Sequence, residues 1–516
     1  MKEKSKLSLF IQGSALLIIS NICIKAINFF LLPLYTAHLT PSMLGVSDSI
    51  TTFTGILFPI LVLGLDSAYS AFYFDEADRE RAKKVFATIG FALFAIGMIP
   101  ILLCLLSGPL SLLIFQKDEY RLVVLVALIG VTMNLWSLPF SLELRLQNRM
   151  GRFGAVSVIT SLTMVLLNIL FVSVMKMGEM ALILSSTIVL AEGVFLYGGF
   201  TGSLPRLRFF DRALLKKMLA FSLPLIPSVL MAWVLSLSDR YILLYNQGDA
   251  AVGLYGIGAR FVLMLNVVIT AVNTAYTTFA FSSKDDENAK KQFYYVFTVV
   301  SLILLAIVFT VSIFGKEIVW LMADHEYYSS YVIIRDMMFG QLLYAVSTFV
   351  SYGIIFEKKS VYSMISVSAG AIVNLALNFI FIPKYGIVAA ALTTLVGYLV
   401  SLVLTYIFSE RLYPCYYGMG KLSLLMGATY ALTFFSAEWS LWIRIGLWLV
   451  TAAAVLLLYR NTVRMVWAFI RGKLRPATGT PSSDPPDPAA ETHSSDLSEQ
   501  EKTDHEKDSR NDLSDR

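Results

Sequence analysis

Long apolar stretches alternate with short polar segments from the N-terminus to about residue 470. Most of these stretches have about 20 residues or more, the length that an α-helix needs to cross the hydrocarbon core of a bilayer. The pattern predicts an all-α polytopic membrane protein with about fourteen transmembrane helices. These helices are expected at residues 8–34, 43–71, 85–115, 122–142, 154–175, 180–201, 217–243, 250–281, 292–315, 330–356, 360–382, 386–408, 421–437 and 441–460.

The composition agrees with a membrane protein. Hydrophobic residues make up 57% of the 516 residues and charged residues 15%, which leaves more apolar surface than a soluble chain of this length can cover. The three cysteines do not have the spacing of a metal site or a disulfide framework. There is no Walker A sequence, no Gly-rich nucleotide loop and no paired His/Cys ligand set. We therefore expect no cofactor, no nucleic-acid partner and, because the loops are short, no enzyme domain outside the membrane.

Clusters of Lys and Arg occupy the N-terminus and every second loop, whereas the other loops are poor in cations. Cation-rich loops remain in the cytoplasm, so the alternation places both termini there. The clusters comprise Lys2, Lys4 and Lys6; Arg79, Arg81, Lys83 and Lys84; Arg145, Arg149 and Arg152; Arg206, Arg208, Arg212, Lys216 and Lys217; Lys284, Lys290 and Lys291; and Lys358 and Lys359.

Three blocks of sequence in the first half of the chain recur in the same order in the second half. Six predicted helices separate equivalent positions, so the two halves share one orientation and are expected to be related by a pseudo-two-fold axis along the membrane normal. Coincidence among apolar residues is the alternative. The blocks are LGVSDSITTF (44–53) with VGLYGIGARF (252–261), 208 positions apart, AYSAF (68–72) with AYTTF (275–279), and LLNILFVSVMKMGEMAL (166–182) with LALNFIFIPKYGIVAAAL (375–392).

The repeat divides the chain into four expected regions. An N-terminal six-helix bundle at 1–205 precedes a C-terminal six-helix bundle at 206–410, and helices 13 and 14 follow at 411–475. The last region, 476–516, has eleven acidic and four basic residues and almost no large apolar side chain. Such a segment cannot bury a core and is expected to be a disordered cytoplasmic tail, which either binds a partner or is simply solvated.

Polar residues inside the predicted helices are the candidates for function, because they are costly at membrane depth unless they face a cavity or a partner. In the first predicted helix, Ser14, Asn21, Lys25 and Asn28 fall on one narrow face. This face predicts a cavity lining in which Lys25 contacts an anion, or else a polar seam between helices. Asp48, near the outer start of the second helix, is placed at a depth where it could neutralise Lys25.

Arg260 is the second candidate. It lies roughly 15 Å from the outer end of the eighth predicted helix, near the middle of the membrane. By the repeat it aligns near Thr52, so the second and eighth helices are expected to face each other across a cleft. Its planar guanidinium suits phosphate, whereas the alternatives are snorkelling to the outer interface or pairing with Asp239 or Asp336. The polar residues that share its arc are Asn266, Thr270, Asn273, Thr274 and Thr277.

Glu192, deep in the sixth predicted helix, is interpreted either as a protonatable group that couples transport to an ion or as a neutral acid in a helix seam. Asp48 is the other candidate for coupling. Two acid–base neighbours near the outer interface are expected to neutralise themselves: Asp239–Arg240 and Arg335–Asp336.

Prolines interrupt the first predicted helix of each half. Pro33 lies in the first helix and Pro224 and Pro227 lie in the seventh. Proline frees backbone carbonyls and kinks a helix, so these positions predict either hinges or static kinks that shape the packing.

The segment FSLPLIPSVLMAWVLSLSDRYIL (221–243) resembles the signature of polysaccharide-biosynthesis flippases of the O-antigen, or Wzx, type. These proteins belong to the multidrug/oligosaccharidyl-lipid/polysaccharide (MOP) exporter superfamily. VGLYGIGARF (252–261) and NFIFIPKYGIVAAAL (378–392) are similar to later segments of that family. The resemblance extends over about 1–460, and the acidic tail has no counterpart in it.

This resemblance implies a bacterial inner-membrane protein that flips polyprenyl-pyrophosphate-linked oligosaccharide by alternating access. Membrane potential or an ion gradient is the implied drive, and the implied partners are the lipid bilayer, a polysaccharide polymerase and glycosyltransferases. In that family a basic central cavity receives the pyrophosphate and the sugar. The matching cations are Lys25 and Arg260, with Asn21, Asn28 and Asn273 as polar neighbours. A cation-coupled multidrug exporter of the same superfamily and a peptidoglycan-precursor flippase are the alternatives.

Overall fold

The computed structural model of the chain describes residues 29, 31–73, 79–283, 289–415, 417–460, 462 and 464. Within these ranges every regular element is a helix, and eleven helical stretches are long and apolar enough to cross a membrane. The chain divides into two units, Met1–Val455 and Leu456–Arg516, and the description below concerns the first. Its helices are α2 (Leu32–His38), α3 (Pro41–Val62), α4 (Leu65–Tyr73), α5 (Arg79–Leu103), α6 (Ser107–Phe115), α7 (Arg121–Leu146), α8 (Met150–Asn168), α9 (Met180–Thr201), α10 (Arg212–Ser222), α11 (Ile226–Gln247), α12 (Asp249–Ser283), α13 (Ala289–Ile313), α14 (Gly315–Met322), α15 (Tyr331–Val350), α16 (Tyr352–Phe356), α17 (Val361–Leu412), α18 (Met419–Phe435) and α19 (Leu441–Leu458), with short 3₁₀ or π turns at Cys104–Leu106, Ile169–Val174, Leu207–Phe209, Leu223–Leu225 and His325–Ser330.

The all-α fold agrees with the sequence prediction, and every predicted helix from 43–71 onward coincides with a helical stretch. The predicted helix 8–34 lies almost wholly outside the described residues. Two predicted helices, 360–382 and 386–408, are joined in α17, which bends at Gly386 (φ 56°, ψ −132°). Helix α18 has only 17 residues, short for a membrane span. The total of fourteen spans therefore stays a prediction.

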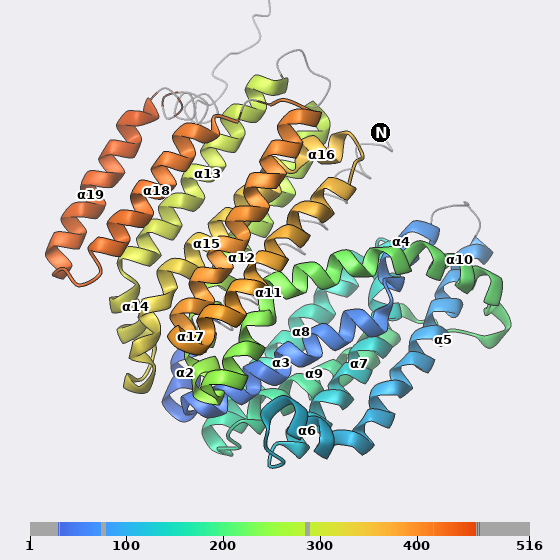
Figure 1. The fold of residues 1–516 in the computed structure, drawn as a ribbon. Helices are drawn as coiled ribbons and strands as arrows, with labels where there is room; N and C mark the ends of the chain where they lie inside the picture. Colours follow the sequence, from blue (N-terminus) through green and yellow to red (C-terminus); the bar gives the residue numbers. More distant parts are fainter. Residues whose placement is uncertain are drawn as a thin grey trace, which may run out of the picture. The chain divides into compact units, whose positions relative to one another are not determined.

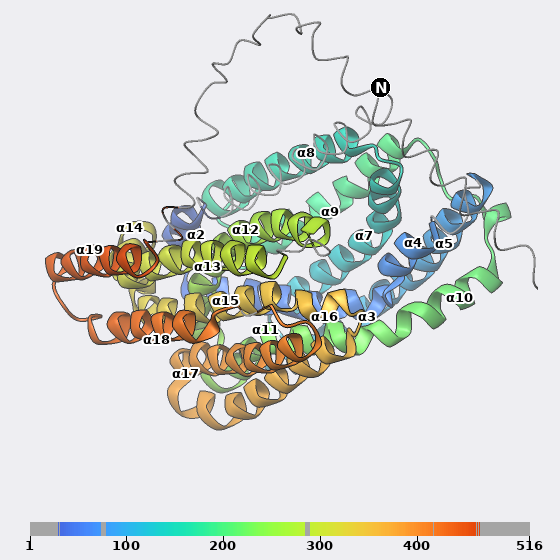
Figure 2. The same cartoon turned by 90° about the horizontal axis from the view of Figure 1, so that it is seen from above.

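The helices form two groups that meet along α3 and α11. Helices α3 and α5 to α9 form one group, with α7 against α9 and α5 against α7. Helices α11 to α18 form the other group, in which α17 packs against both α11 and α15 (Figures 1 and 2). The main contact between the groups is that of α3 with α12, supported by α3 with α11. One buried apolar cluster combines side chains of both groups, including Val46, Ile50, Val252 and Tyr255.

Two of the interruptions in the membrane-spanning stretches touch each other. Helix α3 ends at Leu63 and Gly64, which both have positive φ (55° and 67°), before α4 begins. Between α10 and α11 the chain makes a 3₁₀ turn that contains Pro224. The Ser222 hydroxyl donates to the Leu63 carbonyl at 2.7 Å, which joins the two breaks.

All three prolines predicted as hinges lie where a helix starts. Pro33 is at the beginning of α2, Pro224 is in the 3₁₀ turn, and Pro227 is at the beginning of α11. A proline is tolerated there because the N–H that it lacks has no partner in a first helical turn. Pro224 and Pro227 thus lie at an interruption between α10 and α11, and the hinge role of all three prolines stays a prediction.

A cavity between the two helix groups

Helices α3 and α12 approach each other through glycine at their N-terminal ends. A Cβ atom on Gly45 would lie 1.7 Å from the Asp249 carbonyl oxygen, and one on Gly253 would lie 1.9 Å from the Pro41 carbonyl oxygen. Only glycine fits at either position, because the obstructing atoms belong to the backbone. The contact is reciprocal between residues that are 208 positions apart, as expected where a two-fold axis relates equivalent helices. We call this contact, formed by residues 41–45 and 249–253, the closed end.

A polar cluster strengthens the closed end. The Asp249 carboxylate, only 6% exposed, accepts hydrogen bonds from the Lys117 ammonium group (2.8 Å) and the Tyr120 hydroxyl (3.2 Å). The Ser42 hydroxyl is 3.5 Å from the same oxygen. Because Asp249 begins α12 and its three partners belong to the first half of the chain, this cluster ties the two halves together. We call it the latch. The hydrogen bond to Asp249 raises the pKa of Lys117, which lies in the loop before α7.

One helical turn beyond the closed end, Asp48 of α3 forms an ion pair with Arg260 of α12. Arg260 Nη1 is 3.2 Å from Asp48 Oδ2 and Nη2 is 3.4 Å from Oδ1, so the guanidinium meets the carboxylate in a fork. Nη1 also donates to the Gly256 carbonyl oxygen at 2.8 Å. Gly256 is needed here, since a Cβ atom at this position would lie 1.9 Å from Asp48 Oδ2. Both charged side chains are largely buried, at 18% and 14% exposure.

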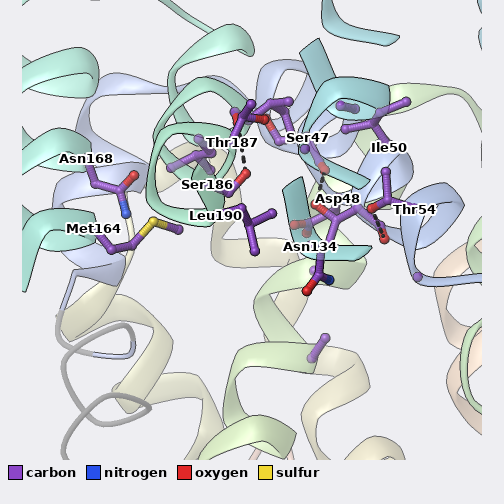
Figure 3. A pocket seen from close by; sticks show the side chains of 18 of the residues that line it. Ser47, Asp48, Ile50, Thr54, Asn134, Met164, Asn168, Ser186, Thr187 and Leu190 are labelled. Carbon is purple, nitrogen blue, oxygen red and sulfur yellow. Dashed lines mark hydrogen bonds between the residues drawn. The ribbon is translucent and has the colours of Figure 1, made fainter. Parts of the chain in front are cut away.

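The ion pair lines a cavity of about 580 Å³ between the two helix groups. Its wall includes residues of α3, α7, α8, α9, α11 and α12, and it is rich in hydroxyl and amide side chains. Figure 3 shows Asn168 and Met164 on one side of the cavity and Asp48, Thr54 and Asn134 on the other. The polar and charged lining residues are Tyr35, Ser47, Asp48, Thr51, Thr54, Asn134, Asn168, Ser186, Thr187, Arg240 and Arg260.

The structure brings some of the predicted site residues to this cavity and not others. Arg260 and Asp48 both line it. Asn273 of α12 lies elsewhere, and its Oδ1 atom is buried without a hydrogen-bond partner among the described residues. Glu192 of α9 also lies outside the lining and accepts a hydrogen bond from Thr163 of α8 at 3.1 Å. The remaining candidates, Asn21, Lys25 and Asn28, lie outside the described residues.

The structure shows which partner each of the buried charged residues has. Arg260 pairs with Asp48, whereas the sequence suggested Asp239 or Asp336 as its possible partners. Arg335 and Asp336 neutralise each other as predicted, with Nε 2.8 Å from Oδ1. The expected side-chain pair of Asp239 with Arg240 is absent from the described salt bridges. Instead, the Asp239 carboxylate is occupied by the hydroxyls of Tyr255 and Thr394 and by the Arg240 backbone N–H.

Several lining residues were not singled out from the sequence. Ser47, Thr51 and Thr54 follow each other at helical spacing on α3, and this periodicity was readable as a polar stripe. Asn134 and Asn168 are single amides in the apolar stretches of α7 and α8. No local pattern tells which way such an isolated side chain points, so only the packing of the helices reveals that the two line one cavity.

Comparison with known proteins identifies the family. The family described as polysaccharide biosynthesis protein matches residues 10–283, which is more than half of the chain. The chain belongs to this family. The MatE family also matches, over residues 224–380. None of the curated proteins matches the chain by sequence.

Solved structures place this member of the polysaccharide biosynthesis family in the MOP-superfamily fold. The lipid II flippase MurJ in an inward closed conformation has a TM-score of 0.69 at 14% identity, over 88% of this chain and all of that one. An inward-facing multidrug resistance MATE transporter of the MOP superfamily has 0.61 at 16% identity, over 76% and 97%. A MOP-superfamily transporter from Pyrococcus furiosus has 0.54 at 15% identity, over 77% and 95%. The chain is thus a multi-pass membrane protein with a transporter fold.

Proposed function

We propose that the chain flips polyprenyl-pyrophosphate-linked oligosaccharide across the cytoplasmic membrane for surface-polysaccharide biosynthesis. The observation that carries the proposal is the composition of the cavity wall, where two guanidinium groups occur beside neutral hydroxyl and amide side chains in a member of the polysaccharide biosynthesis family. Among the described residues, the lining has two Arg and one Asp, and hence a net positive charge.

Each part of such a substrate has a chemical counterpart. Guanidinium groups bind phosphate oxygens through parallel hydrogen bonds and keep their charge. Sugar hydroxyls both donate and accept hydrogen bonds, as do the amides of Asn134 and Asn168 and the lining hydroxyls. The polyprenyl tail needs no polar site, because it is as apolar as the hydrocarbon core of the membrane. A cavity of this kind holds the head group while the tail remains in the bilayer.

The closed end corresponds to one of the two states of an alternating-access cycle, the state that is closed to the outside. Contact of Gly45 with Gly253 shuts the cavity on the side that the loop charges predict to be outside. Opening on that side requires α3 and α12 to separate, which breaks both the latch and the Asp48–Arg260 pair. The helix interruptions at Leu63–Gly64 and Leu223–Leu225 are the places where the adjoining helices would bend. In this proposal both termini are cytoplasmic, glycosyltransferases supply the substrate and a polymerase consumes it.

A peptidoglycan-precursor flippase is the second candidate. It is favoured by the structural match to MurJ, which spans that protein's whole length, whereas the MATE transporter match covers less of this chain. Export of a cationic drug is disfavoured, because a cation would enter a cavity whose described charges sum to a positive value.

The test is transport by the full-length protein in proteoliposomes. Three cargoes are compared under pH and potential gradients: a fluorescent undecaprenyl-pyrophosphate oligosaccharide, fluorescent lipid II and a lipophilic cationic dye. We expect the oligosaccharide to be flipped and Arg260→Ala and Lys25→Ala to reduce its flipping while the protein stays folded. Flipping of lipid II alone would select the second candidate, and transport of the dye alone would overturn the proposal.

A further inference from the structure

Among the described residues, the cavity is lined by two guanidinium groups that are in different electrostatic states. Arg260 is occupied, because Asp48 takes both of its terminal nitrogens and the Gly256 carbonyl takes a further hydrogen bond. Its charge is therefore compensated before any ligand arrives. An anion that binds Arg260 has to displace a carboxylate that already holds it in a fork.

Arg240 of α11 is in the opposite state. Its Nη1 atom makes one hydrogen bond, of 3.3 Å, to the Thr52 hydroxyl. Its Nε atom is buried and has no hydrogen-bond partner among the described residues. No carboxylate of a described residue forms a salt bridge with the Arg240 guanidinium group. The described lining thus contains a guanidinium group with unused donors.

The neighbouring acid, Asp239, is close enough to attract the Arg240 charge but forms no salt bridge with its guanidinium group among the described residues. The Asp239 carboxylate is almost completely buried, at 2% exposure, and its oxygens are taken by Tyr255, by Thr394 and by the Arg240 backbone N–H. Asp239 therefore anchors α11 to α12 and α17, while the guanidinium of Arg240 extends to the cavity. The Nη2 atom of Arg240 makes no hydrogen bond among the described residues and, unlike Nε, is not buried, so it is the donor that a ligand in the cavity can reach.

Both guanidinium groups reach the same turn of α3. Arg260 contacts Asp48, and Arg240 contacts Thr52, whose hydroxyl donates to the Asp48 carbonyl at 2.8 Å. A ligand with two adjacent anionic groups that lies along this turn meets both cations. A pyrophosphate diester is such a ligand, since each of its phosphates carries a negative charge.

We infer that Arg240 is the residue that first binds the pyrophosphate of the substrate, and that the second phosphate then exchanges with Asp48 for Arg260. This inference rests on the proposed function for the identity of the head group. It assigns the two arginines unequal roles. Loss of Arg240 removes the initial contact, and loss of the Asp48 carboxylate frees Arg260 and strengthens anion binding.

The test measures equilibrium binding of undecaprenyl pyrophosphate to the full-length protein in detergent by native mass spectrometry, with the neutral alcohol undecaprenol as the reference lipid. We expect Arg240→Gln to weaken pyrophosphate-lipid binding by about tenfold or more, as for a lost charge-assisted hydrogen bond. Arg240→Lys should recover part of it, and Asp48→Asn should bind more tightly than wild type. Binding of undecaprenol should not change in any variant.

The control is Arg335→Gln, which removes a partly buried guanidinium that lies outside the cavity lining. It should bind as wild type does. Wild-type-like binding by Arg240→Gln, weaker binding by Asp48→Asn, or equal affinity of the wild type for the two lipids would each overturn the inference. The proposed function is tested separately: if no glycan lipid is flipped but pyrophosphate binding still depends on Arg240, the function fails and the binding role stands.

Discussion

Helices α3 and α12 carry the same residue at one pair of equivalent positions of the repeat, where the helices touch. At the next equivalent positions, which form the binding region, they carry different residues. Gly45 and Gly253 are equivalent, and each accepts the backbone of the other helix. One turn further on, Asp48 corresponds to Gly256 by the offset of 208 residues, and Thr52 corresponds to Arg260. Close approach across a two-fold axis requires a small residue on both sides. An ion pair requires different residues on the two sides, so the binding region has departed from the symmetry that the closed end keeps.

The largest effect is expected from breaking the symmetric part. Gly45→Ala and Gly253→Ala each place a methyl group within 2 Å of a backbone oxygen of the other helix, and a backbone atom cannot rotate away. Overpacking of this kind costs about 1–3 kcal/mol, all of it in the closed state. Transport should fall by about tenfold or more, equally in both variants. A cysteine introduced at Ser47 should become more accessible to a membrane-impermeant thiol reagent added from the outside.

Gly427→Ala is the matched control, because nothing lies within 4 Å of the added methyl group. It should transport normally. A large loss of transport in only one of the two closed-end variants would contradict the reciprocal contact, since equivalent positions would then not be equivalent in effect.

An intermediate effect is expected from the asymmetric part. Asp48→Asn and Arg260→Gln each leave one charge without its partner, and each should lower the free energy of unfolding in detergent by about 1.5–3 kcal/mol. The double variant should lose less than the two single variants together, because neither charge is then left unpaired. Thermal unfolding of all four proteins gives the coupling energy. Strict additivity would show that the pair contributes no coupling in solution.

The parts of this arrangement that the sequence predicted are those set by local pattern. The lengths of apolar stretches depend on the membrane alone, so the helices from 43–71 onward were predictable. The depth of Arg260 in its helix followed from counting residues, and the facing of the second and eighth predicted helices followed from the repeat. The resemblance at 221–243 pointed to the family that residues 10–283 match.

The partners of Arg260 and Asp239 were not predictable in the same way. Which carboxylate reaches Arg260 depends on the register of α3 against α12, and that register is fixed by the contact of Gly45 with Gly253. Similarly, Asp239 and Arg240 are adjacent in sequence and were expected to neutralise each other. The Tyr255 and Thr394 hydroxyls come from α12 and α17, so only the packed structure shows that they occupy Asp239 and leave the Arg240 side chain to the cavity.

The smallest effect is expected from the latch, whose cation is 48% exposed. Lys117→Met should favour opening of the closed end by only about 0.2–1 kcal/mol, because water and salt screen an exposed ion pair. Since pairing raises the pKa of Lys117 above 10.5, the ammonium group contributes fully below pH of about 10.5 and loses its contribution as the pH rises through the raised pKa. The wild type should therefore behave alike from pH 6 to pH 9 and lose its advantage over Lys117→Met at ionic strength of about 1 M.

Asp249→Asn distinguishes the charge from the hydrogen bonds, since its amide oxygen still accepts from Tyr120 while the attraction to Lys117 is lost. Accessibility of the cysteine at Ser47 measures the opening in each variant. Asp249→Asn should match Lys117→Met and show the same insensitivity to salt. A much larger opening in Asp249→Asn than in Lys117→Met would mean that the carboxylate holds the closed end through Tyr120 and Ser42. In that case the halves are joined by neutral hydrogen bonds there, and Asp48–Arg260 is the charge pair that regulates opening.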